Sequence, residues 1–322
     1  MTSPRLAVLL VVLVGAVSDV CAQESPLESL KRAAVLNDTG QFRAVVELVE
    51  PLLGSNSQKL GNAVAGVAWN MRGLALQNLG NRDEARRSYE SAIKMLRDIP
   101  DQTVQYATAL DNLGSLEAEE GQLKESEGLR IRAKELYNSV GDHAGVARSA
   151  SSLSVVALAL GSRKEAHHYL ADAHREEGLV STPDSRDLAW MSGAECLLDE
   201  AEGKFQAALD QVNRVVDLWT HQFGPKYYLL SSAFFVRGRL HHVLRDDAAA
   251  AEDLRYSLML LSNNNEENSR LYFLTKIMYA KVLRNSGKKD DASRMESDAT
   301  AALERLNHQQ CRGCTISAEG IR

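Results

Sequence analysis

Residues 69–100 read WNMRGLALQNLGNRDEARRSYESAIKMLRDIP, and this stretch decides the fold. On both sides of Gly80, apolar and small residues recur every three or four positions, which is the spacing of amphipathic helices. A glycine at such a boundary suits the left-handed residue that ends one helix and begins a tight turn. The stretch therefore predicts a helix, a short turn and a second helix.

The same turn recurs along the chain at a nearly constant interval of 40 to 42 residues. The turn positions are Gly40, Gly80, Gly121, Gly161, Gly203, Arg245 and Gly287, so that Arg245 stands at the one position without glycine. Self-similarity at this period indicates a solenoid, in which each unit buries its apolar face only against its neighbours. The turn positions predict about seven such units.

Mostly small side chains recur at three fixed distances from each turn position. Seven residues before it stand Ala33, Gly73, Gly114, Ser154, Cys196, Gly238 and Ala280. Five residues after it stand Val45, Ala85, Ser126, Ala166, Ala208, Ala250 and Ala292. Twelve residues after it stand Leu52, Ala92, Ala133, Ala173, Val215, Ser257 and Ala299. Small residues at fixed points on two helices allow the helix backbones to approach closely, so we expect an all-α fold of paired helices.

This pattern resembles that of tetratricopeptide repeats. The second unit shows it best, with Trp69, Gly73, Gly80, Ala85, Tyr89, Ala92 and Pro100. The period of 40 to 42 residues, with Gly224-Pro225 before the sixth unit, is similar to the longer repeats of kinesin light chains. The resemblance covers about residues 26–309 and implies a right-handed superhelical solenoid of about seven helix–turn–helix units.

Four residues depart from the pattern of the family. Arg72 and Arg237 stand where a leucine is usual, and Asp247 and Lys289 stand where a bulky residue is usual. The first and last units match least well, which is typical of the capping repeats of a solenoid.

The first 22 residues have the features of a secretory signal. Arg5 precedes an apolar segment of 12 residues, Leu6–Val17, and a small-residue cleavage site ends at Ala22. The apolar segment is shorter than the roughly 20 residues of a membrane-spanning helix, and an uncleaved signal anchor is the alternative. We therefore expect a signal peptide over 1–22, a repeat solenoid over 23–309 and a tail over 310–322, in a periplasmic or secreted protein.

The composition and motifs argue against several classes of function. The net charge of −6 disfavours nucleic acid as the main partner. The sequence contains no phosphate-binding glycine loop, no nucleophile elbow and no zinc-protease helix, so we predict a protein that is not an enzyme, without cofactor or small-molecule substrate. His167 and His174 are two helical turns apart and could present a metal face, but we expect them to lie on a solvated helix face.

The cysteines have different expected roles. Cys196 occupies a small-residue position of its repeat and is expected to be a buried packing residue. Cys311 and Cys314 form a Cys-x-x-Cys motif after the last helix, and an oxidising compartment would favour a disulfide between them. His308 adds a third soft ligand, so a zinc site without an evident fourth ligand, a redox pair and free thiols are the alternatives.

The resemblance also implies where a partner would bind, because the first helix of each unit lines the concave groove in this family. In the second and third units the lining positions include Asn70, Leu74 and Asp111. In the fifth to seventh units they bring aromatic, aliphatic and basic residues together, namely Trp190, Phe235, Arg239, His242, Ile277, Lys281 and Arg284. Aromatic and arginine side chains are the usual anchors of interfaces. The alternative is that Trp190, Phe235 and Ile277 only pack between adjacent units.

These observations predict an exported, non-enzymatic protein-interaction module or scaffold that binds a peptide or protein segment in its concave groove. The resemblance leaves the partner unidentified and makes association with the cell envelope an expectation. Two alternatives stay open. One is a binding, redox or metal protein whose chemistry lies in the Cys311/Cys314 tail, and the other is a self-assembling envelope scaffold.

Overall fold

The computed structural model describes residues 25–53, 61–264, 266–285 and 289–310. The expected signal peptide, Cys311 and Cys314 lie outside these ranges. The described helices are α1 (Pro26–Asp38), α2 (Phe42–Leu53), α4 (Asn62–Asn78), α5 (Arg82–Leu96), α6 (Thr103–Glu119), α7 (Leu123–Ser139), α8 (His143–Ala159), α9 (Arg163–Glu177), α10 (Ser185–Ala201), α11 (Phe205–Phe223), α12 (Leu230–Val243), α13 (Asp247–Asn263), α14 (Arg270–Asn285) and α15 (Lys289–Gln310), with a 3-10 turn, η1 (Pro100–Gln102), before α6.

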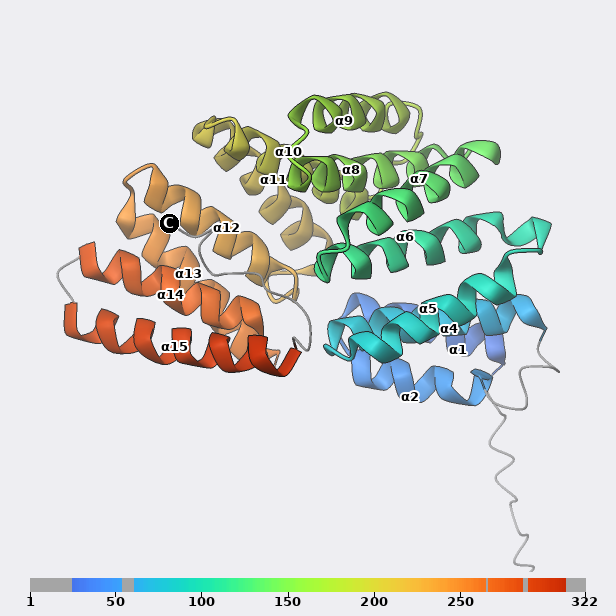
Figure 1. The fold of residues 1–322 in the computed structure, drawn as a ribbon, viewed down its shortest axis with the longest axis horizontal. Coiled ribbons are helices and arrows are strands. Elements are labelled where there is room, and N and C mark those ends of the chain that lie inside the picture. The colour runs from blue at the N-terminus through green and yellow to red at the C-terminus, as the bar shows by residue number, and fades with distance from the viewer. Residues whose placement is uncertain (1–24, 54–60, 265, 286–288, 311–322) are drawn as a thin grey trace, which may run out of the picture.

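The fourteen helices form seven consecutive pairs, one pair for each expected unit (Figure 1). Over the described ranges the chain contains helices and turns but no strand, so the all-α solenoid is confirmed. None of the helices in these ranges combines the length and apolarity needed to cross a membrane.

The turns within the units have the left-handed backbone that the sequence predicts. Every turn position in the described part of the chain has a φ between 68° and 84°. Arg245, which stands in place of a glycine, has a φ of 68°. Among the described residues it is the only one other than glycine with a positive φ. The repeat therefore imposes its turn geometry even where the residue does not favour it.

The small residues lie where the paired helices approach each other. A Cβ atom added to Gly73 of α4 would lie 2.6 Å from Cδ1 of Tyr89 in α5, which is closer than carbon atoms pack. Ala85 and Ala92 are fully buried on the same side of α5. These three predicted positions are therefore buried between the paired helices, and at Gly73 the Tyr89 ring leaves no room for a Cβ atom.

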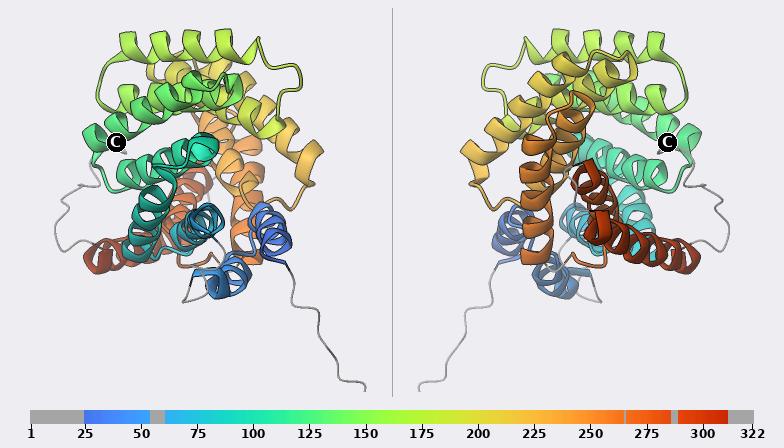
Figure 2. Two further views of the ribbon diagram at one scale, coloured as in Figure 1. Left: turned by 90° about the vertical axis from the view of Figure 1, so that its right-hand side faces the viewer. Right: turned by 90° about the vertical axis from the view of Figure 1, so that its left-hand side faces the viewer.

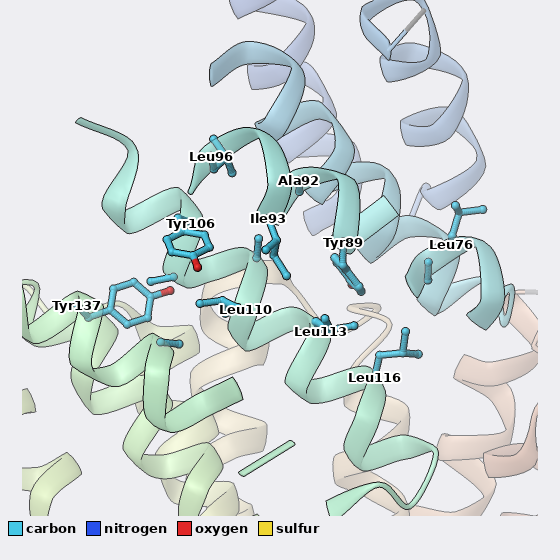
Figure 3. Packing of buried hydrophobic residues seen from close by; sticks show 14 of the residues in the cluster. Leu76, Tyr89, Ala92, Ile93, Leu96, Tyr106, Leu110, Leu113, Leu116 and Tyr137 are labelled. Atoms are coloured by element: carbon cyan, nitrogen blue, oxygen red, sulfur yellow. The ribbon is translucent and has the colours of Figure 1, made fainter. Parts of the chain in front are cut away.

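Large apolar residues fill the space between successive units. Figure 3 shows the part of the core that the second and third units share, where Tyr89 and Leu96 of α5 lie near Leu110 and Leu113 of α6. Tyr89, Leu96 and Leu110 are among the largest fully buried side chains of the described chain. The core therefore runs along the solenoid from unit to unit, as a stack of repeats requires.

The two arginines that depart from the family pattern have acquired polar partners. Arg72 and Arg237 each lie eight residues before their turn, and Ser88 and Asp253 each lie eight residues after it. The Arg237 guanidinium donates two hydrogen bonds to the Asp253 carboxylate, at 2.9 and 2.6 Å. Arg72 Nη1 donates to Ser88 Oγ at 2.9 Å. Each arginine thus replaces an apolar contact between paired helices by a polar contact at the same place in the repeat.

The solenoid curls until its first unit contacts the junction of the fifth and sixth units. In the views of Figures 1 and 2, the turn between α1 and α2 lies beside the connection between α11 and α12. The rings of Phe42 and Tyr228 meet edge to face there, with their centroids 5.2 Å apart. This contact joins residues 186 positions apart, whereas repeats of a solenoid otherwise contact their neighbours.

We predict that Arg245→Gly stabilises the protein by about 0.5–1 kcal/mol. A left-handed backbone costs a non-glycine residue about 1–2 kcal/mol, and the larger backbone entropy that glycine loses on folding offsets part of the gain. The free energy of unfolding from chemical denaturation measures the change.

The matched reverse substitution is Gly203→Arg, at a turn with a φ of 76°. No atom lies within 4 Å of a Cβ added at Gly203, so only the backbone strain is expected to lower stability, by a similar amount. A less stable Arg245→Gly protein would show that the arginine side chain contributes more than its backbone strain removes.

Candidate functional site

The first helices of the units lie on the inner side of the curl. Figure 1 shows α8 inside α9 and α14 inside α15. On α10, Ala189 and Cys196 are buried in the cluster with α11, and Met191 and Leu198 in the cluster with α8 and α9. The face of α10 that these contacts leave uncovered is therefore directed to the inside of the curl.

Two large apolar side chains stand on this uncovered face. Trp190 is 49% exposed and Leu197 is 37% exposed, although the other faces of α10 are packed. The Trp190 ring meets the buried Trp219 ring of α11 edge to face, with centroids 5.7 Å apart and planes at 74°. Trp190 thus packs at one edge against a ring of its own unit, and the rest of its side chain is exposed.

Phe235 and Ile277 are more closely bound to the core. Both are half-buried, and Phe235 packs against the cluster of Leu254, Met278 and Val282 at the junction of the last two units. Phe235 therefore contributes to stacking as well as to the lining of the groove, which makes it a weaker candidate than Trp190.

The basic residues of the groove form ion pairs within the chain. The Arg239 guanidinium of α12 pairs with the Glu200 carboxylate of α10, with Nη2 2.6 Å from Oε2. Arg284 of α14 pairs with Glu296 of α15. Lys281 is half-buried on the same helix. The positive charges that the sequence places here are therefore at least partly balanced by carboxylates of the chain.

His242 belongs to a short polar chain across the last two units. Its Nδ1 lies 2.6 Å from Asp247 Oδ1, and Asn285 of α14 donates to Asp247 Oδ2 at 3.0 Å. Asp247 thereby accepts hydrogen bonds from two successive units, which explains why an acidic residue stands where the family usually has a bulky one. The Nδ1 atom of His242 is therefore engaged by Asp247 within the chain.

In the second and third units, hydrogen bonds also link nearly equivalent positions, displaced by one residue. Asn112 Nδ2 donates to Asn70 Oδ1 at 3.1 Å, and Gln77 donates to Glu119 at 2.6 Å. Each of these two pairs is separated by 42 residues, close to one repeat period. This spacing is visible in the sequence, although sequence reasoning missed it. Complementary polar residues about one period apart on first helices indicate a series of hydrogen bonds between units, here called a polar ladder.

Asp111 is a correction to the expected lining of the groove. The residue is only 6% exposed, and it accepts hydrogen bonds from Arg130 Nη1 at 3.1 Å and Ser149 Oγ at 3.0 Å. It faces α7 and α8, which carry these two partners. Its carboxylate is part of the core and is not available to a partner.

The histidines of α9 join the fourth unit to the fifth. His167 Nε2 lies 2.6 Å from Glu202 Oε1, and His174 Nε2 lies 2.5 Å from Glu195 Oε1. Hydrogen bonds from Lys204 and His167 lower the pKa of the Glu202 carboxyl to about 2. Within the described ranges, no group of three or more His, Cys, Asp or Glu side chains is arranged to hold a metal ion. Both histidines therefore pair with carboxylates of the fifth unit and remain about half exposed.

Two open clefts flank the exposed side of α11, away from the predicted groove residues. They have volumes of about 490 and 590 Å³ and share Asp217 and His221. The larger cleft is mainly apolar, with Phe234, Tyr256 and Pro225 in its wall. Neither cleft includes a side chain that the sequence assigned to partner binding.

The fold and its inner face define an α-helical repeat solenoid. Residues 105–175, which span most of the third and fourth units, match the family model of the tetratricopeptide repeat. The helix pairs on either side repeat the same arrangement, so the described chain has the fold of a tetratricopeptide repeat solenoid.

Solved structures share this fold at low sequence identity. A Rap protein complexed with competence and sporulation factor is 12% identical, with a TM-score of 0.63 over 88% of this chain and 82% of that chain. The Rap conjugation gene regulator of plasmid pLS20, in complex with the Phr* peptide, is 12% identical, with a TM-score of 0.57 over 83% and 81%. The Cut9-Hcn1 structure of the APC/C is 17% identical, with a TM-score of 0.57 over 85% of this chain and 48% of that chain. This chain thus spans about half the length of the last protein. A comparison with curated proteins finds no match.

We predict that Cys196 reacts at least about a hundredfold more slowly with iodoacetamide in the folded protein than in the unfolded one. It is a free thiol with 2% exposure, and burial raises its pKa to about 12, so the reactive thiolate is nearly absent at pH 8. The rate is measured by mass spectrometry on a Cys311→Ser, Cys314→Ser protein.

A control moves the thiol by one residue, from the packed face to the inner face of α10. The Cys196→Ala, Leu197→Cys protein in the same background is expected to react quickly, because Leu197 is exposed. Equal rates for Cys196 and for the thiol introduced at position 197 would contradict the orientation of α10 described above.

Proposed function

We propose that this chain is a non-enzymatic interaction module that binds a peptide or protein segment along its concave face. The observation that carries the proposal is the inner face of α10, where Trp190 and Leu197 are exposed on a helix whose other faces are packed. Exposed apolar side chains at the centre of a concave surface are typical anchors for a partner.

Two structures with a similar fold support this proposal. One Rap protein is complexed with competence and sporulation factor, and the other is in complex with the Phr* peptide. Those ligands belong to those proteins, and the likeness at 12% identity concerns the fold. The common feature is a helical solenoid of similar extent whose curvature can enclose a chain segment.

The chemistry of the inner face suggests what kind of segment fits. An apolar side chain of the ligand would cover the open face of Trp190 and gain most of the affinity through buried apolar area. An acidic group nearby would compete with Glu200 for the Arg239 guanidinium, since that pair lies within the same two units. We therefore propose an extended segment with an apolar residue beside an acidic one.

The location of the protein is also part of the proposal. The signal-like segment 1–22 supports export. An exported module of this kind would act in the periplasm or outside the cell and could associate with the cell envelope. The same compartment would favour a disulfide between Cys311 and Cys314.

We predict that Trp190→Ala with Leu197→Ala weakens binding by about thirtyfold or more, which corresponds to the loss of about 2 kcal/mol for one real anchor. The probe is a peptide selected from a displayed random library by the purified chain, and its affinity is measured by calorimetry. Circular dichroism confirms that each variant is folded.

A matched control removes two apolar side chains that are exposed elsewhere. Val140 and Leu179 lie at the ends of the second helices α7 and α9, and Val140→Ala with Leu179→Ala is expected to leave the affinity unchanged. A second comparison, Phe235→Ala with Arg239→Ala against Asn70→Ala with Leu74→Ala, locates the site along the groove. Equal losses in the Trp190 and control variants, or the selection of no peptide, would overturn the proposed function.

A further inference from the structure

The first unit contacts the far side of its own solenoid through the turn that joins α1 to α2. A Cβ added to Gly40 in this turn would lie 3.2 Å from Cδ1 of Tyr228, which belongs to the connection between α11 and α12. Phe42, at the start of α2, meets the same ring edge to face. Tyr228 therefore packs in the hydrophobic cluster of the first two units, although it lies between the fifth and the sixth.

An ion pair reinforces this contact from the start of the fifth unit. Arg186 Nη1 in α10 donates to Asp38 Oδ1, at the end of α1, over 2.9 Å. The Arg186 guanidinium also pairs with Asp184 and lies over the Phe223 ring, 5.9 Å from its centroid. Two separate elements of the inner curl, α10 and the α11–α12 connection, thus hold the same turn of the first unit.

The contact differs in kind from the stacking of adjacent units. The turn within unit one lies at one edge of the helical ribbon, and the connection between units five and six lies at the other edge. The two edges meet because the ribbon has completed about one turn of its curl, as Figure 2 shows from two sides. The ion pair of Arg186 and Asp38 is only partly buried, whereas neighbouring units bury whole helix faces.

An unbroken series of aromatic rings joins this contact to the proposed binding face. The order is Phe42, Tyr228, Tyr227, Trp219 and Trp190, and each ring lies within 5.0 to 5.8 Å of the next, centroid to centroid. Within the described part of the chain the buried Trp219 Nε1–H has no hydrogen-bond acceptor, so packing alone fixes this ring. A movement of the Trp190 ring would therefore be transmitted to Tyr228 through ring contacts.

We propose that the contact of the first unit with the fifth and sixth, formed by Asp38, Gly40, Phe42, Arg186 and Tyr228, is a reversible latch that holds the solenoid in a closed turn and controls the entry of a ligand to the inner face. In the closed state the inner faces of α4, α6, α8 and α10 lie within one joined turn. When the latch opens, the ligand segment associates with the face around Trp190 at a higher rate. The ligand part of this inference rests on the proposed function, and the opening of the latch does not.

The first experiment measures the latch without any ligand. Spin labels are attached at Arg43→Cys in α2 and Arg255→Cys in α13, both exposed positions, in a Cys311→Ser, Cys314→Ser protein. We expect a short and a long distance by pulsed electron resonance, and a larger share of the long distance in Arg186→Ala. A single short distance that Arg186→Ala leaves unchanged would overturn the latch.

A disulfide provides the closed reference state. The Cβ position of residue 40 lies 3.5 Å from Tyr228 Cβ, within the roughly 3.5–4.5 Å range of disulfides, so Gly40→Cys with Tyr228→Cys can be bonded and released in one protein. We use the peptide selected above as the probe. Its association rate is expected to fall by about tenfold or more in the oxidised protein and to recover on reduction.

The outcomes separate the two proposals. Equal association rates in the oxidised and reduced proteins would overturn control by the latch, while the proposed function would stand. Two label distances in a protein that selects no peptide would support the latch and reject the proposed function. If the disulfide does not form, the association rate of Arg186→Ala decides, because a freely opening latch must bind faster than the unchanged protein.

Discussion

The close approach of two helices at a few small residues is the constraint on which the rest of this structure depends. Gly73 lies directly against the Tyr89 ring, and any larger residue would separate α4 from α5. The distance between paired helices fixes how the next pair stacks on them, and that stacking fixes the curvature. The inner face and the contact of the first unit with the fifth and sixth both follow from this repeated distance.

The sequence predicts the parts of the fold that are local and periodic. Turn positions and small residues recur with one period, so each unit supplies independent evidence for the others, and even Arg245 has the backbone of the glycine it replaces. Asp111 was misplaced for a physical reason. Its partners Arg130 and Ser149 come from two other helices, and a polar residue at a lining position gives no sign that such partners exist.

The contact between Phe42 and Tyr228 could not be predicted from a single unit. It arises from the sum of small rotations between successive units, and an error of a few degrees in each would separate the two rings. The candidate site shares this limitation in part. Trp190 could be assigned to the inner face by its position before the turn, but the ion pair of Arg239 with Glu200 depends on how the sixth unit stacks on the fifth.

The polar ladder along the groove shows how a solenoid can specify its own curvature while leaving a place for a ligand. Hydrogen bonds about one period apart tie the first helices of the second and third units together, and ion pairs join α10 to α8 and to α12, while Trp190 and Leu197 stay exposed on α10. A partner would cover this apolar pair.

The contact of the first unit also changes how the chain can come apart. An open solenoid frays from both ends, because a terminal repeat has only one neighbour. Here the first unit has a second attachment, made of an edge-to-face aromatic pair and an exposed ion pair that together contribute about 1–2.5 kcal/mol. That free energy makes unzipping from the amino-terminal side about 5- to 70-fold rarer, so amide exchange should spread inward mainly from the seventh unit.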